Sequence, residues 1–359
     1  MAQLAAFGRL WAATHVLHMF CAGFATRTAQ AQLAVLSLAA LHPSRPAVLG
    51  GAIGVRLAGL ASKMPVMHDS QYLAFQVDCV LLFALLAHAA HRSLPAGQRW
   101  LTPLTAAEQR AVVAACAAPT LRMLAVFFFA AGFWKINTGF LNPEYSCSTI
   151  FFLQLLDHLP SGIADHPTLV QIVAQLAPLT TITVEIGVGL LLLCPVPLLG
   201  AVLMLLFHVM IGLTPPPNNI ATFGCVTCTR LFFLSPQAAT EALHEIVTTP
   251  RLLAGAGAVA AVMLGVTRRH HAEGAPVDVP LVFLSLLCCL YARAFSSSAL
   301  GWRQGTRLAA QADGTGAGRW QRRSGWLMTL SMAIYALLLP MLGVMDLGAP
   351  NMFSNLRMQ

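Results

Sequence analysis

Lys135 is the residue best suited to chemistry, because it ends a long apolar run, Ala111–Trp134. The chain contains one other lysine, Lys63, and every other strongly basic residue is arginine, which effectively cannot lose its proton. Burial disfavours the ammonium form, so a lysine at this place can supply a free amine that acts as a general base. The alternative is a lysine whose stem covers apolar surface while its charged end reaches the lipid head groups.

Two acids and a histidine also lie within apolar runs. Asp78 and Glu185 are costly at membrane depth unless they are paired or hydrated. Each is either a structural partner of a cation across the bundle, or part of a polar pocket that binds a substrate head group or tunes Lys135. His208 has apolar neighbours, an environment in which a histidine is more often a hydrogen-bonded core residue. The candidate cationic partners are Arg122, Arg230 and Lys135.

Composition places these residues in a membrane protein. Of the 359 residues, 57% are hydrophobic and only 9% are charged, against about 25% charged in soluble domains. The mean hydropathy is +0.71. The net charge is +8, but the basic residues are scattered and form no stripe with interleaved aromatics, which excludes a typical nucleic-acid binder. We therefore expect an all-α, polytopic transmembrane bundle in contact with the lipid bilayer.

The apolar runs indicate about nine spans, since crossing the hydrocarbon core takes about 20 largely apolar residues. No ten-residue segments alternate with period two, which favours helices over a barrel. The prolines in Cys194–Pro197 predict a tight hairpin between two helices. The clearest runs are Tyr72–Ala90, Ala111–Trp134, Leu179–Cys194, Leu198–Leu213, Leu252–Val266, Pro280–Tyr291 and Gly325–Val344; Leu10–Ala25, Ala31–Leu41 and Ala47–Ala61 are weaker, and Ile220–Leu234 is short enough to be re-entrant.

Two regions can be distinguished along the chain. Residues 1–240 carry all the residues discussed above, and residues 241–359 add further apolar helices and a basic connection at 301–324. The positive-inside rule places that connection in the cytoplasm. An integral, multi-pass location follows: the endoplasmic reticulum membrane in a eukaryote, or the plasma membrane in a bacterium.

Four short blocks follow one another over about residues 68–236. They are His68-Asp69-Ser70-Gln71-Tyr72-Leu73; Gly132-Phe133-Trp134-Lys135-Ile136-Asn137-Thr138-Gly139-Phe140-Leu141 with Tyr145-Ser146-Cys147; Thr183-Val184-Glu185; and Leu206-Phe207-His208. In this order, the blocks resemble those of the membrane proteins with an HTTM domain, the vitamin K-dependent γ-carboxylase-like family.

The resemblance implies a concrete chemistry. In the carboxylases the matching lysine deprotonates vitamin K hydroquinone, the anion reacts with oxygen, and the resulting strong base takes a proton from a peptide glutamate before carbon dioxide adds. By resemblance, the cofactor here is vitamin K hydroquinone or a related quinol. The implied catalytic residues are Lys135, Glu185 and His208, and the implied substrate-binding residues are His68, Tyr72, Asn137 and Tyr145.

The same residues allow a second interpretation, a non-enzymatic membrane protein that binds or transports a small lipophilic molecule or a peptide. In that case Lys135 and Glu185 form a structural ion pair. The carboxylases also carry a strand-rich lumenal domain for their peptide substrate, whereas the residues after Pro236 read as further helices. His15 and His18 share a helix face at metal-ligand spacing, but no carboxylate lies near them in the sequence.

Overall fold

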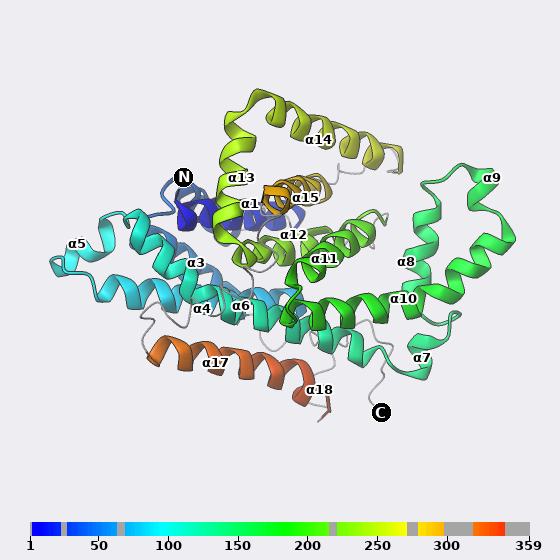
Figure 1. Ribbon diagram of the computed structural model, residues 1–359, viewed down its shortest axis with the longest axis horizontal. Helices are drawn as coiled ribbons and strands as arrows, with labels where there is room; N and C mark the ends of the chain where they lie inside the picture. Colours follow the sequence, from blue (N-terminus) through cyan, green and yellow to red (C-terminus); the bar gives the residue numbers. More distant parts are fainter. Residues whose placement is uncertain are drawn as a thin grey trace.

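The computed structural model describes residues 2–22, 27–62, 69–214, 221–270, 279–297 and 319–341, and within these ranges every regular element is a helix. The all-α prediction is thereby confirmed (Figure 1). The first half comprises α1 (Gln3–Ala22), α2 (Arg27–Leu41), α3 (Pro46–Ala61), α4 (Asp69–Ala90), α5 (Ala96–Leu101), α6 (Ala106–Trp134), α7 (Thr138–Leu141), α8 (Cys147–Leu156), α9 (Ser161–Ala164) and α10 (Pro167–Leu193). The second comprises α11 (Pro197–Gly212), α12 (Ala221–Thr229), the 3₁₀ turn η1 (Arg230–Leu234), α13 (Pro236–Thr248), α14 (Pro250–His270), α15 (Val279–Ser297), α17 (Arg319–Ala333), the π-helical turn η3 (Ile334–Leu338) and α18 (Leu339–Met341).

The expectation of about nine spans is not confirmed. Among the described residues, four helices are long and apolar enough to cross a membrane: α4, α6, α10 and α15. A fifth is reached if α13 and α14, which meet at a bend of 92°, together form one broken span. Several other apolar runs form shorter helices, such as α3 and α11 with 16 residues each, because prolines or turns end them before the length of a span.

Helix α6 is the centre of the arrangement. It begins with a capping box, in which the Thr105 hydroxyl and the Glu108 carboxylate each accept a backbone N–H of the other's residue. It packs against α1, α4, α10, α17 and η1, and Figure 1 shows α17 lying along the lower side of α4 and α6. The side that carries Phe127 and Phe128 is buried. A single long helix therefore connects the two regions distinguished in the sequence.

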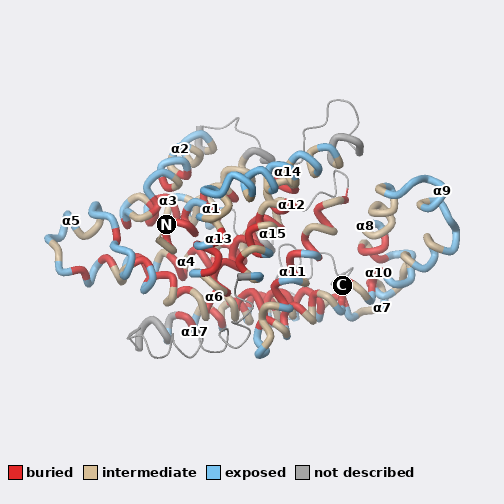
Figure 2. Tube along the Cα trace, turned by 45° about the horizontal axis from the view of Figure 1, so that its top comes forward, coloured by how far each residue is buried: buried red, intermediate tan, exposed pale blue. Residues whose placement is uncertain are grey.

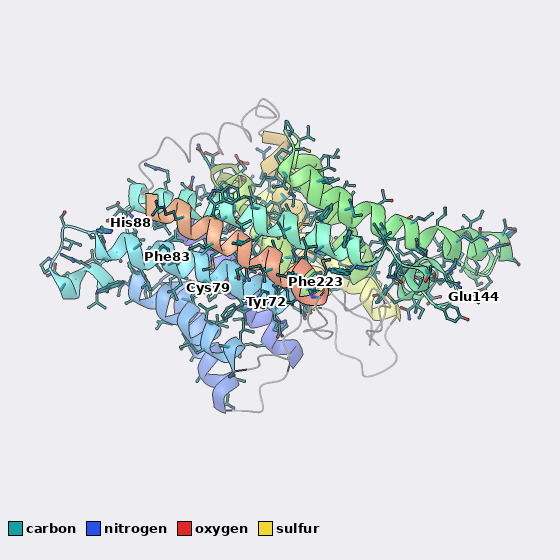
Figure 3. All side chains as sticks on the ribbon, turned by 90° about the horizontal axis from the view of Figure 1, so that it is seen from below. Tyr72, Cys79, Phe83, His88, Glu144 and Phe223 are labelled. Atoms are coloured by element: carbon teal, nitrogen blue, oxygen red, sulfur yellow. The ribbon has the colours of Figure 1, made fainter. Side chains whose placement is uncertain are left out.

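The core lies where α1, α4, α6, α12, η1 and α15 meet (Figure 2). Exposed residues gather on α5, α9 and α14, at the margins of the molecule. Figure 3 shows Tyr72, Cys79, Phe83 and His88 following one another along α4 toward α5, with Glu144 far away beside the helical hairpin of α8 to α10.

The hairpin predicted at Cys194–Pro197 is confirmed. Helix α10 ends at Leu193 and α11 begins at Pro197, and the two helices pack against each other. A Cβ added to Gly200 would lie 3.0 Å from the backbone nitrogen of Leu192. A larger residue there would therefore push the two helices apart. The predicted basic connection falls outside the described residues up to residue 318, and residues 319–324 belong to α17 rather than to a loop.

Candidate functional site

Lys135 and Glu185 form a buried ion pair between the end of α6 and the middle of α10. The Lys135 ammonium donates to both carboxylate oxygens of Glu185, at 2.7 Å and 3.0 Å, and to the carbonyl of Ala131 at 3.2 Å. Lys135 is 6% exposed and Glu185 is 7% exposed. The sequence-based alternative in which Lys135 extends to lipid head groups is therefore wrong, and its charged end turns inward.

Two glycines bring the two helices close enough for this pair. A Cβ on Gly132 of α6 would lie 2.6 Å from Ile186 Cγ1 and 2.9 Å from the Ile186 backbone nitrogen. A Cβ on Gly189 of α10 would lie 2.7 Å from the Ala125 carbonyl oxygen. Small residues at both crossing points allow the backbones to approach. The short distance between Lys135 and Glu185 follows from this packing.

Asn137 is the N-cap of α7 and also hydrogen-bonds to the last residue of α6. Its side-chain oxygen accepts from the backbone N–H of Phe140 at 2.9 Å, and its amide nitrogen donates to the Trp134 carbonyl at 2.9 Å. The Phe140 ring is thereby held with its centroid 5.9 Å from the Lys135 ammonium, within the range of a cation–π contact. Asn137, for which the resemblance implies a substrate-binding role, orders the backbone that follows Lys135.

Cys147, the first residue of α8, lies in the electrostatic field of the pair. Burial raises the pKa of its thiol to about 11; Lys135 lowers this pKa and Glu185 raises it by smaller amounts. At neutral pH the group is therefore a thiol, a neutral lining rather than a nucleophile. Tyr145, which precedes it by two residues, is 70% exposed, and no hydrogen bond that we resolve connects it to the pair.

Tyr72 stacks face to face on Tyr335 of η3, with ring centroids 3.5 Å apart. The next carbonyl along η3, that of Ala336, accepts from the indole N–H of Trp134 at 2.8 Å. A π-helical turn loosens the regular hydrogen bonding of a helix, which makes such a carbonyl available. Tyr72 is thus connected through η3 to Trp134, the residue that precedes Lys135.

His208 is fully buried but is not part of the Lys135 site. Its ring lies among Phe128, Phe207 and Phe223, with centroid distances of 5.6, 5.7 and 4.9 Å. Neither ring nitrogen has a hydrogen-bond partner among the described residues. The structure therefore brings Lys135 and Glu185 together and leaves His208 on a separate aromatic cluster. His68 lies outside the described residues.

Asp78 belongs to a second buried site. It accepts from the guanidinium of Arg230 at 3.0 Å, as one of the sequence-based alternatives proposed, and also from Arg56 at 3.1 Å and the Trp11 indole at 3.0 Å. Sequence analysis did not connect Arg56 and Trp11 with Asp78, although Arg56 is the one charged residue in the run Ala47–Ala61. Arg122, another candidate partner, lies 4.3 Å over the Trp326 ring and 3.4 Å from the Thr329 hydroxyl.

Comparison of the chain with models of known protein families, with curated proteins and with solved structures finds no match. Within the described residues, no group of three or more histidine, cysteine, aspartate or glutamate side chains is arranged to hold a metal ion. The site is therefore characterised by its own geometry, which is an ammonium and a carboxylate in direct contact in apolar surroundings.

Proposed function

We propose that this chain is an integral membrane protein of the carboxylase-like class, in which Lys135 takes a proton from a lipid-soluble quinol. The observation that carries the proposal is the direct contact between the Lys135 ammonium and the Glu185 carboxylate, 2.7 Å apart and nearly excluded from water. Lys135 directly follows α6, a helix that is long and apolar enough to span a bilayer.

The pair supplies a way to make a neutral lysine. A buried ion pair gains from mutual attraction but loses hydration, so its neutral form lies much closer in free energy than it does in water. When the Lys135 N–H proton passes to Glu185, the products are an amine and a carboxylic acid, and no net charge is created. The amine can then accept the phenolic proton of a quinol, forming an ammonium and a quinol anion.

The four blocks resemble the γ-carboxylase-like family, in which a second reaction follows the deprotonation of the quinol. In that chemistry the quinol anion reacts with oxygen, which supplies the oxidising power. Phe140 presents its ring face to the ammonium, and Cys147 is a neutral neighbour. Our proposal covers the deprotonation of the quinol and its reaction with oxygen; carboxylation of a peptide is the family's further step and requires its own assay.

A non-enzymatic binding or transport protein is the second candidate, and one observation favours it. The three acceptors around the Lys135 ammonium, two on Glu185 and one on Ala131, match the three protons it can donate. A fully satisfied ammonium is what a structural ion pair requires. The two candidates differ in whether removal of the pair abolishes turnover of a quinol or leaves the activity of the protein unchanged.

Oxygen uptake by the purified full chain in lipid nanodiscs, with vitamin K hydroquinone added, tests the proposal. We expect quinol-dependent uptake that falls by about 100-fold or more in Lys135→Met, because general-base catalysis contributes about 10²–10⁴-fold. Arg293→Gln, which removes an exposed cation bonded to Glu245, is the matched control and should keep full uptake. Absence of uptake by folded wild-type protein, or unchanged uptake in Lys135→Met, would reject the quinol reaction.

A further inference from the structure

A cluster of charged and polar side chains around Asp78 is buried in the core, away from the Lys135 site. Its members come from α1, α3, α4 and the start of η1, which are widely separated in the sequence. Arg230 and Asp78 are 0% exposed and His15 is 1% exposed. The members are Trp11, His15, Arg56, Asp78 and Arg230.

The cluster holds one more positive charge than negative charge. Arg56 and Arg230 are both cationic, since arginine keeps its proton in proteins, and both donate to the single carboxylate of Asp78. His15 adds no charge, because its Nε2 lies 3.4 Å from the terminal amino group of Arg230 and is placed to accept from it. An unbalanced charge at this depth costs several kcal/mol unless an anion offsets it.

The cluster is also short of hydrogen-bond acceptors. With Nε2 of His15 accepting, the neutral ring carries its proton on Nδ1, and this buried N–H has no partner among the described residues. The buried Nε–H of Arg230 has none either. Arg56 uses its Nε–H on Asp78, and the described residues offer no recorded acceptor to its two terminal amino groups. Every unsatisfied group in the cluster is therefore a donor.

Excess positive charge and unsatisfied donors point to the same missing component, and we propose that the cluster binds one small monovalent anion. A halide or a carboxylate such as formate has the required charge and only accepts hydrogen bonds. The Arg56 side chain is 14% exposed, whereas those of Asp78 and Arg230 are 0% exposed, so Arg56 is the residue at which an anion reaches the cluster. One bound anion balances the charge and offers an acceptor to a cluster whose donors lack partners among the described residues.

The test compares the thermal unfolding of the full chain in detergent in chloride, in formate and in gluconate, at constant ionic strength and with one cation. Gluconate is also monovalent but is much larger than chloride or formate. A ligand that binds the folded protein raises Tm with its concentration. We expect Tm to rise by about 2 °C for each tenfold increase in the bound anion above saturation, with gluconate as the reference. A rise with chloride alone identifies a halide site, and a rise with formate alone identifies a carboxylate site.

Variants of two arginines, one in α3 and one just before it, separate specific binding from a general salt effect. Arg56→Gln removes the excess charge and should abolish the anion dependence of Tm. Arg45→Gln removes an exposed arginine just before α3 and should leave it unchanged. If Arg56→Gln does not fold, Arg56→Lys keeps the charge and should move the midpoint of the anion dependence at least tenfold higher. Equal Tm values for wild-type protein in all three anions would overturn the proposal, and so would a full anion response in Arg56→Gln.

Discussion

Two buried ionic sites within the described residues, the Lys135–Glu185 pair and the Asp78 cluster, differ in charge balance and in the number of elements that they join. The Lys135–Glu185 pair connects two neighbouring helices, α6 and α10, and its charges cancel. The Asp78 cluster connects α1, α3, α4 and η1 and carries an excess positive charge. The charges of Lys135 and Glu185 cancel, whereas Arg56 and Arg230 keep their protons and share the single carboxylate of Asp78.

The Lys135–Glu185 pair and the Asp78 cluster also lie in different parts of the fold. The pair lies at the end of α6, beside the chain turn into α7 and α8, and its residues are 6% and 7% exposed. Arg230 and Asp78 lie inside the core with no exposure at all. Both sites are buried, so burial alone does not distinguish them. Under the proposed function the balanced pair carries the proton transfer, and the central cluster connects α1, α3, α4 and η1.

The largest effect is expected from Asp78→Asn, which leaves two buried guanidinium groups without their carboxylate. Breaking a buried ion pair costs about 3–5 kcal/mol, and we expect the upper end of that range because Asp78 serves Arg56, Arg230 and Trp11 together. Equilibrium unfolding in mixed detergent micelles measures the loss. A loss below about 1 kcal/mol would show that the cluster does not hold these elements together.

The next largest loss of stability is expected at the Lys135–Glu185 pair, where a double-mutant cycle measures the interaction between the two side chains. Glu185→Leu alone should destabilise the protein by about 3 kcal/mol, because it leaves an unpaired buried ammonium. Lys135→Met with Glu185→Leu should recover most of that stability, since an apolar pair of similar volume can replace a buried ion pair. The same unfolding assay on the wild type, both single variants and the double variant gives the coupling energy. Additive single effects would contradict direct pairing.

A smaller loss is expected from Gly189→Ala. The added methyl group would lie 2.7 Å from the Ala125 carbonyl oxygen and from the Phe129 nitrogen, so α6 and α10 must separate, at a cost of about 1–3 kcal/mol. Gly187→Ala in the same helix is the control, because a Cβ there meets no atom within 4 Å. Equal stability of the two variants would show that close approach at Gly189 does not set the distance between the helices.

The smallest effect is expected at the exposed ion pair of Arg293 and Glu245, whose side chains are 40% and 42% exposed. Solvent-exposed pairs contribute about 0–1 kcal/mol, so Glu245→Gln should fall within this range in the unfolding assay. The stability loss of Glu245→Gln is the reference against which the losses at the two buried sites are compared. A loss as large as that of Asp78→Asn would remove the distinction between buried and exposed pairs on which the comparison depends.

The sequence was sufficient for the helical class, for the hairpin at Cys194–Pro197 and for Lys135 and Glu185 as a candidate pair, because apolar runs and isolated charges are local signals. It was not sufficient for the Asp78 cluster. His15 and Arg230 lie 215 positions apart, and His15 lies 3.8 Å from the Asp78 carboxylate only through the packing of α1 on its neighbours. The expected number of spans is not confirmed among the described residues, because hydropathy marks apolar runs without showing where turns shorten them.

Tyr145, Tyr72 and His208 illustrate the same limit within the implied site. Their order along the chain resembles the family, but Tyr145 is 70% exposed, Tyr72 stacks on Tyr335, and His208 lies among phenylalanines. Side chains near one another in a motif can point to different sides of a helix. The tertiary arrangement was needed to show that the side chains of Lys135 and Glu185 are in direct contact.

The most direct test of the central claim is oxygen uptake by the double variant Lys135→Met, Glu185→Leu in lipid nanodiscs with vitamin K hydroquinone. This variant should keep the fold, so that lost activity reports on chemistry rather than stability. Our account predicts a folded double variant with no quinol-dependent oxygen uptake beside an active wild type. A folded double variant that takes up oxygen at the wild-type rate would contradict it and leave Lys135 and Glu185 as a structural pair.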